Sequence, residues 1–227
     1  MNPRRPYRSD LSDARWALTE PTLTAWRQAR LDRRPTGAPA PTDLRDIFNA
    51  ILYLNRTGVA WAYLPHDFPP HGTVYSSYAA WREEGIFAQL NYDLTGVARV
   101  KEGRDPQPTA AVIDTQTIKT STNPPTASQG TDAAKKIVGR KRSVATDALG
   151  LLLAVVVCAA SVSENQAGIQ VLDQAKGAYP TLAATWVDLD SNDQRNTASG
   201  WVDRGSDGSA GNVRRDERGL VAAVARR

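Results

Sequence analysis

Along the first hundred residues, apolar side chains recur every three or four positions, which is the spacing of amphipathic helices. The expected helices cover residues 11–33, 43–57 and 73–84, and a short further helix starts near Ile86. Asp43 is placed to cap the second helix and Gly58 to end it, whereas Pro21 should break or restart the first. A helix-turn-helix DNA reader and a small helical bundle without DNA contact both fit this pattern.

Beyond residue 105 the pattern changes to short apolar runs, which are typical of strands. The expected strands cover residues 110–113, 142–146, 151–159 and 182–187, with a helix over 164–176 before the last. Asp114 and Asp188 each close a strand, and Asp147 precedes Ala-Leu-Gly, where we expect it to hold a tight turn. This order predicts an RNase H-like mixed sheet with a flanking helix. The expected fold class is therefore α+β or α/β, with an N-terminal helical, helix-turn-helix-like domain before an incomplete RNase H-like sheet.

The amino-acid composition shows that the chain is basic. The 227 residues carry a formal net charge of +4, and the sequence pI is about 9.3. Five basic residues stand within the eight positions 135–142. Clustered cations favour a nucleic-acid partner, although a solvated basic surface is the alternative. The one cysteine, Cys158, excludes a disulfide within the chain, which fits a reducing cytoplasm, and its apolar neighbours predict a buried, inert thiol.

One stretch combines these signals. An apolar run ends at Asp114, the basic block at 135–142 follows, and a long hydrophobic hairpin comes next. A carboxylate at the exit of a strand can be held rigidly in a site, and the basic block lies close to it in sequence. The arrangement suggests a metal-binding acid beside a polyanion.

Three motifs in this order resemble a known family. The segments VIDTQTIKT, GRKRSVATDALGLLLAVVV and TWVDLDSND, together with the helical stretch from Arg45 to Phe87, are similar to bacterial insertion-sequence transposases of the fifth family. These enzymes are of the DDE type and have an RNase H-like fold. The resemblance covers roughly residues 11–194. It implies a basic helical segment at 1–34, a helical DNA-binding domain at 35–105 and a partial catalytic core at 106–194. Residues 195–227 are rich in Ser, Gly, Asp and Arg, which predicts an irregular, disordered tail with helical character only at 217–227.

The resemblance also implies a chemistry. Asp114 and Asp188 match the first two acids of the family's triad, which holds two Mg²⁺ ions, for which Mn²⁺ can substitute. Metal-activated water then cleaves a DNA strand at a terminal inverted repeat, and the freed 3′-hydroxyl attacks target DNA. The implied partner is double-stranded DNA at the bacterial nucleoid in the cytoplasm, with a homodimer left open and no membrane. The expected DNA contacts are Lys119, Lys135, Lys136, Arg140, Lys141 and Arg142, and Thr115 and Gln116 follow the first acid closely enough to touch substrate.

The third acid of the triad is the weak point of the resemblance. No stretch after Asp188 resembles the VERTFGWL-like helix that carries it in the family, and Glu217 is the one candidate. A frameshift and a shortened paralogue both account for this departure. Transposase activity impaired by loss of the third acid is therefore expected. The alternatives are a catalytically inactive remnant that occupies terminal repeats, and an RNase H-like nuclease of another kind.

Overall fold

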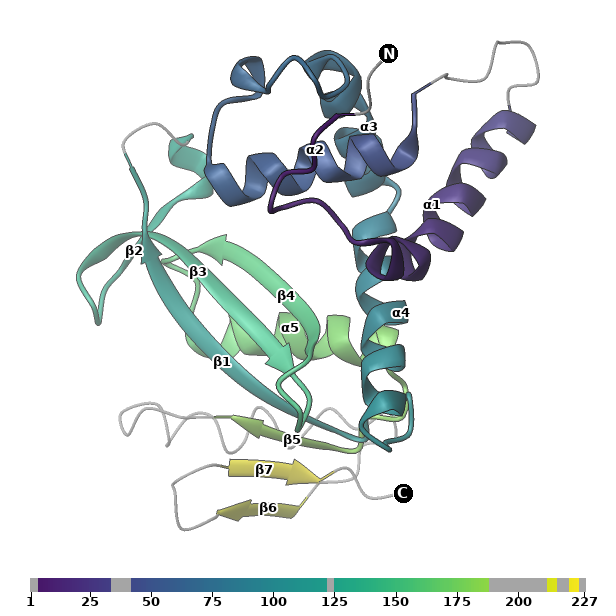
Figure 1. The fold of residues 1–227 in the computed structure, drawn as a ribbon. Helices are drawn as coiled ribbons and strands as arrows, with labels where there is room; N and C mark the ends of the chain where they lie inside the picture. Colours follow the sequence, from purple (N-terminus) through teal and green to yellow (C-terminus); the bar gives the residue numbers. More distant parts are fainter. Residues whose placement is uncertain (1–3, 34–41, 122–124, 188–211, 216–220, 225–227) are drawn as a thin grey trace. The chain divides into compact units, whose positions relative to one another are not determined.

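The computed structural model describes residues 4–33, 42–121, 125–187, 212–215 and 221–224 (Figure 1). The chain divides into two compact units, residues 1–94 and 95–227. The helices at the N-terminal side are α1 Asp13–Arg33, α2 Leu44–Thr57, the 3₁₀ turn η1 Trp61–Tyr63, α3 His71–Glu83 and α4 Ile86–Lys101. None of the helices in the described part of the chain is both long enough and apolar enough to cross a membrane.

The predicted limits of α2 are confirmed. The carboxylate of Asp43 accepts a hydrogen bond from the backbone N–H of Arg45 at 2.7 Å. Gly58 ends the helix with φ of 70°, a left-handed conformation that favours glycine. The prediction for Pro21 was wrong, because α1 runs through it. Proline costs the helix one backbone hydrogen bond, but burial of Leu23 in the core two residues later holds the segment helical.

The core of the first unit forms around Trp81. Its side chain is fully buried and lies edge-on to Trp26, with ring centroids 5.7 Å apart, and edge-on to Phe87 at 6.1 Å. The other buried members of this core come from all four helices and the α2–α3 connection: Leu23, Leu44, Ile47, Ala50, Leu54, Leu64, Phe68, Val74 and Leu90. The amphipathic pattern of the sequence is thus satisfied within one helical cluster.

Besides the end of α4, the described part of the second unit contains a mixed sheet and one further helix. Its elements are β1 Ala110–Lys119, the 3₁₀ turn η2 Thr126–Ser128, β2 Gly130–Asp132, β3 Ile137–Thr146, β4 Leu152–Ala159, α5 Glu164–Ala178, β5 Ala184–Val187, β6 Asn212–Arg215 and β7 Val221–Val224. The strand order is β2-β3-β1-β5-β7-β6, and β4 pairs with β3. Only the β1–β5 pair is parallel among the described strands. The expected helical region followed by a partial RNase H-like mixed sheet is confirmed.

The first strand is much longer than predicted. It was expected to end before Asp114, but it continues to Lys119, so that Asp114 is its fifth residue. The polar continuation alternates between its two faces and pairs with β3 from Val112↔Thr146 to Lys119↔Gly139. This pairing supplies the backbone hydrogen bonds that a polar segment needs to stay extended.

Gly139 belongs to the same close pairing. A Cβ atom at this position would lie 2.0 Å from the carbonyl oxygen of Ile118. The glycine of the GRKR motif is therefore required by the close approach of β3 to β1.

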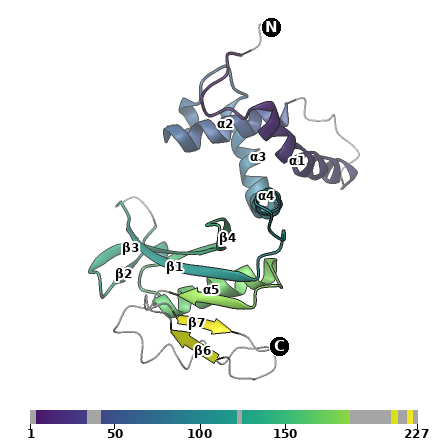
Figure 2. The same cartoon turned by 60° about the horizontal axis from the view of Figure 1, so that its bottom comes forward.

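Helix α5 covers one face of the sheet (Figures 1 and 2), and among the described residues of the second unit the β1 side chains of the other face are exposed. Alternation along β1 and β3 puts Ala111, Ile113 and Ala145 on the covered face, where all three are buried. We call the opposite face of β1, β3 and β4 the open face. Its β1 side chains, at residues 112, 114, 116 and 118, are all exposed.

The predicted turn role of Asp147 is confirmed. Its carboxylate accepts hydrogen bonds from the backbone N–H groups of Leu149 and Leu151, both at 2.9 Å. It also makes a buried ion pair with Arg99 of α4. Arg99 donates a further bond to the carbonyl of Asp105 at 2.7 Å. The β3–β4 hairpin is thereby tied to the end of α4 within the second unit.

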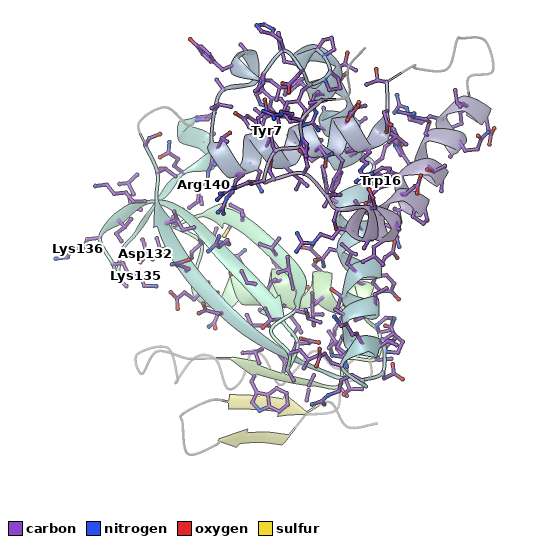
Figure 3. The ribbon with its side chains drawn as sticks, in the orientation of Figure 1. Tyr7, Trp16, Asp132, Lys135, Lys136 and Arg140 are labelled. Carbon is purple, nitrogen blue, oxygen red and sulfur yellow. The ribbon has the colours of Figure 1, made fainter. Side chains whose placement is uncertain are left out.

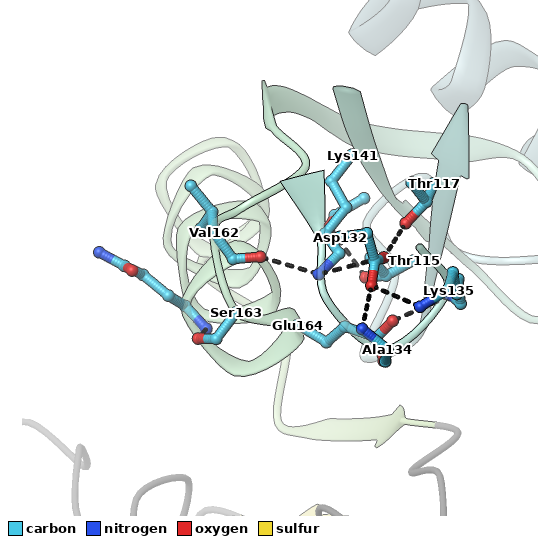
Figure 4. A network of polar contacts seen from close by, with 11 residues as sticks. Thr115, Thr117, Asp132, Ala134, Lys135, Lys141, Val162, Ser163 and Glu164 are labelled. Atoms are coloured by element: carbon cyan, nitrogen blue, oxygen red, sulfur yellow. Dashed lines mark hydrogen bonds and ion pairs between the residues drawn. The ribbon is translucent and has the colours of Figure 1, made fainter. Parts of the chain in front are cut away.

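A second buried acid, Asp132, joins three parts of the sheet unit (Figure 4). It accepts hydrogen bonds from the Thr117 hydroxyl at 2.6 Å and from the backbone N–H groups of Ala134 and Lys135. Its carboxylate lies 3.7 Å from the Lys141 ammonium, which donates to the Val162 carbonyl at 2.8 Å. Asp132 therefore links β1, the β2–β3 turn and the start of α5.

The C-terminal residues depart from expectation. Residues 217–227 were expected to have helical character, but Val221–Val224 form β7 instead. This strand pairs antiparallel with β5 and β6, from Ala184↔Val224 and Asn212↔Val224 onward. The hydrogen bonds of two flanking strands therefore outweigh the local helical preference of this short segment.

Replacing Trp81 with alanine should destabilise the helical unit by about 3–5 kcal/mol, because it leaves a large cavity among the surrounding aromatic rings. Urea unfolding followed by far-UV circular dichroism measures this change. Tyr63→Ala is the matched control, since Tyr63 is 79% exposed and should change stability little. Equal losses for the two variants would show that Trp81 is not central to the core.

Asp132→Asn should destabilise the sheet unit at neutral pH, and the loss should shrink in acid. The pKa of Asp132 is lowered, chiefly by the hydrogen bond from Thr117. Burial raises this pKa, but the Lys135 N–H and the Lys141 charge lower it further. A carboxyl group whose pKa is lowered in the folded state stabilises the fold fully above its unfolded-state pKa of about 4. This stabilisation is lost as the pH falls through the folded-state pKa. Hydrogen exchange of β2 and β3 amides across this range measures the effect. A difference from wild type that does not change with pH would contradict it.

Candidate functional site

Asp114 lies on the open face, in the middle of β1. Its strand partner is Val144 of β3, and the side chain is exposed. It makes no hydrogen bond or ion pair with any other residue that the structure describes. Within the described part of the chain its carboxylate therefore has no competing partner, and it lies on a strand that pairs with β3 on one side and β5 on the other.

The neighbouring strand β5 ends directly beside this position. The parallel register pairs Val112 with Trp186 and Ile113 with Val187. Val187 is the last described residue before Asp188, so Asp188 lies outside the described residues, as does Glu217. The structure thus places the first of the three predicted acids and the strand that leads to the second.

Strand alternation divides the predicted basic block between the two faces of the sheet. Lys141 lies on the covered face, is 5% exposed, and is held by Asp132 and the Val162 carbonyl. Arg140 and Arg142 lie on the open face. Arg140 is half-buried and bonds Ser128, whereas Arg142 is exposed and donates to the Gln116 side chain at 2.8 Å. One basic motif therefore has both an internal and an external role.

The other cations of the prediction lie at the ends of strands. Lys135 and Lys136 stand at the tip of the β2–β3 hairpin (Figure 3). The Lys135 ammonium pairs with Glu164 at 3.0 Å, and Lys136 is exposed with φ of 53°. Lys119 is the exposed last residue of β1.

The surroundings of Asp114 suit a hard divalent cation. Among the described residues no group of three His, Cys, Asp or Glu side chains comes together to hold a metal. Asp114 itself has an exposed carboxylate without a competing partner in the described part, which is the type of oxygen ligand that Mg²⁺ prefers. The donor chemistry of Asp114 is therefore compatible with Mg²⁺.

Asp132 was not singled out from the sequence, although it organises the hairpin. The available signal was an aspartate two residues before Ala134, the spacing at which a carboxylate bonds a following backbone N–H in a turn. Its contact with Lys141 could not be found this way, because it depends on the pairing of β2 with β3. Cys158, expected to be buried, is only half-buried, and burial raises the pKa of its thiol.

Comparison with protein families gives two matches. The family model described as a transposase of the IS4/5 family matches residues 11–91, and the model described as a transposase DDE domain matches residues 105–198. The first match falls on the helical unit, and the second includes both Asp114 and Asp188. Neither a curated protein nor a solved structure matches the chain significantly. The chain belongs to the insertion-sequence transposases of the IS4/5 family and carries their DDE domain.

Proposed function

We propose that this chain binds the ends of an insertion sequence and cuts DNA there with the help of Mg²⁺ held by Asp114 and Asp188. The observation that carries the proposal is the register of β1 with β5, in which Ile113 pairs with Val187. The next residues of the two strands are the two aspartates. Paired residues of parallel strands share a face, so a one-residue extension of this register would put both carboxylates on the open face.

The DDE domain family uses divalent metal ions, and DNA is its partner. Bound Mg²⁺ would supply a Lewis acid and an activated water for displacement at the phosphodiester. The chain's own contribution would be to present Asp114 on β1 beside the strand β5 that leads to Asp188, and to bring cations to the phosphates. Arg142, exposed on the open face, and half-buried Arg140 would contact the DNA backbone, together with the exposed cations at strand ends, Lys119 and Lys136. Lys141 and Lys135 are occupied by Asp132 and Glu164, so we give them a structural part.

We further propose that cleavage by this chain is weak. After Asp188 the printed sequence has one glutamate, Glu217, and no aromatic residue follows it. A poorly placed third ligand would raise the barrier by on the order of several kcal/mol if that ligand positions a metal. DNA binding does not depend on this acid. A DNA-binding protein that occupies the terminal repeats without cutting them is therefore the second candidate.

Asp114→Asn should weaken Mn²⁺ or Mg²⁺ binding about tenfold or more, because an amide oxygen lacks the charge of a carboxylate. Isothermal titration of the full chain measures this affinity. Asp173→Asn is the matched control: it removes an exposed carboxylate from α5, on the covered side of the sheet, and should leave metal binding unchanged. Equal metal affinity of Asp114→Asn and wild type would refute the metal site.

Binding to the element's terminal repeats should persist in EDTA, while nicking of a plasmid that carries them should be slow in Mg²⁺. Basic contacts to phosphate need no metal, whereas strand cleavage does. Electrophoretic mobility shift at physiological salt measures the first property and plasmid relaxation the second. Rapid nicking would contradict impaired cleavage, and binding that does not distinguish the repeats from unrelated DNA would argue against the second candidate.

A further inference from the structure

The open face carries one pair of side chains that the proposed metal site does not use. Gln116 of β1 and Arg142 of β3 are register partners, both exposed, and the Arg142 guanidinium donates to the Gln116 side-chain oxygen at 2.8 Å. The next pair on the same face is Asp114 with Val144. Two residues along a strand span about 7 Å. The Gln116–Arg142 pair therefore lies about 7 Å along the strands from the Asp114–Val144 pair.

The partner of Arg142 is neutral, which distinguishes Arg142 from Lys141 and Lys135 of the same basic block. Lys141 and Lys135 face the carboxylates of Asp132 and Glu164, which compensate their charges. Arg142 makes no ion pair within the described residues. The Gln116 amide fixes the guanidinium while leaving its full charge and most of its donors free. The Arg142 guanidinium can therefore bind an anion without first breaking an ion pair with a carboxylate.

The remaining open-face neighbours of Arg142 favour a nucleotide backbone over a free ion. Val157 is its partner on β4, and Val155 is the partner of Val144; they are 59% and 40% exposed. An exposed aliphatic strip beside a fixed guanidinium suits the apolar face of a sugar next to a phosphate. An isolated inorganic anion would gain nothing from this strip.

We infer that Arg142 binds a DNA phosphate that neighbours the phosphodiester at Asp114, and that Gln116 is the positioning residue that aims it. This inference rests on the proposed function for the place of Asp114, and it adds the residue that fixes the substrate's register on the sheet. Guanidinium groups bind phosphate oxygens through paired N–H donors, which gives direction as well as charge. The GRKR motif then serves two ends: Lys141 holds the hairpin together and Arg142 holds the substrate.

The test measures binding of a fluorescein-labelled random-sequence DNA duplex by anisotropy, over a range of KCl concentrations and in Ca²⁺. Arg142→Gln should lower affinity roughly tenfold or more and reduce the magnitude of the salt slope by about one. Gln116→Leu should lower affinity less and leave the slope unchanged, because the charge is still present. Gln116→Glu should reproduce the smaller slope of Arg142→Gln, since a carboxylate beside Arg142 competes with phosphate.

Lys176→Gln is the matched control. It removes one positive charge from α5, on the covered side of the sheet, and should keep the wild-type slope. Thermal unfolding of each variant reports whether it folds. A wild-type slope in folded Arg142→Gln would overturn the phosphate contact, and a smaller slope in Gln116→Leu would overturn the positioning role.

The two proposals fail separately. Unchanged metal affinity in Asp114→Asn, with the Arg142 effects intact, would remove the metal site and leave a DNA-binding sheet face. The reverse result would keep the metal site and remove Arg142 from the substrate. The metal titration is made without DNA and the anisotropy series is compared at one Ca²⁺ concentration, so neither readout depends on the other.

Discussion

The antiparallel pairing of β1 with β3 over eight residue pairs is the constraint on which the sheet unit depends. It fixes the side of the sheet on which every polar residue of both strands lies. A shift of one residue would turn one of the two strands over: either Asp114 would lie under α5 and Ile113 in solvent, or Arg142 would lie under α5 and Lys141 in solvent. Either shift would bury a charge without a partner, which strongly destabilises a fold. The same register therefore specifies the core and the candidate site.

Three features hold this register along its length. Ile113 and Ala145 are paired near the end of the ladder that lies away from the β2–β3 hairpin, and both are buried under α5. At the hairpin end, Asp132 binds Thr117 of β1 and Lys141 of β3 together. Near that end, Gly139 admits the Ile118 carbonyl at a distance that no side chain allows. Apolar burial, a buried ion pair and a close backbone approach thus act at different points of one ladder, so loss of one leaves the others to oppose slippage.

The sequence was sufficient for elements whose signals are local. The Asp43 cap, the Gly58 stop and the Asp147 turn follow from chemistry within four residues of each position, and all three are present in the structure. It was not sufficient for the end of β1. The segment after Asp114 is polar, and it is a strand only because β3 pairs with it. Pro21 shows the same limit, since the packing of α1 outweighs the local cost of proline.

The residues of the candidate site also differ in how far the sequence alone could predict their positions. Asp114 was predicted as a site residue from its place after an apolar run, and the structure puts it in a more rigid position, inside a strand with partners on both sides.

The basic block was predicted as one unit, because a sequence shows that cations cluster but not which way each one points. In the fold, neighbours in the chain point to opposite faces, so Lys141 and Arg142 cannot share a role. A lysine buried with Asp132 fixes the strand, and the arginine beside it is left exposed on a neutral amide. Because both come from adjacent residues, any movement of the Lys141 anchor would also move the guanidinium. The precision of the proposed phosphate contact on the open face would therefore depend on the Lys141–Asp132 ion pair buried on the other side of the sheet.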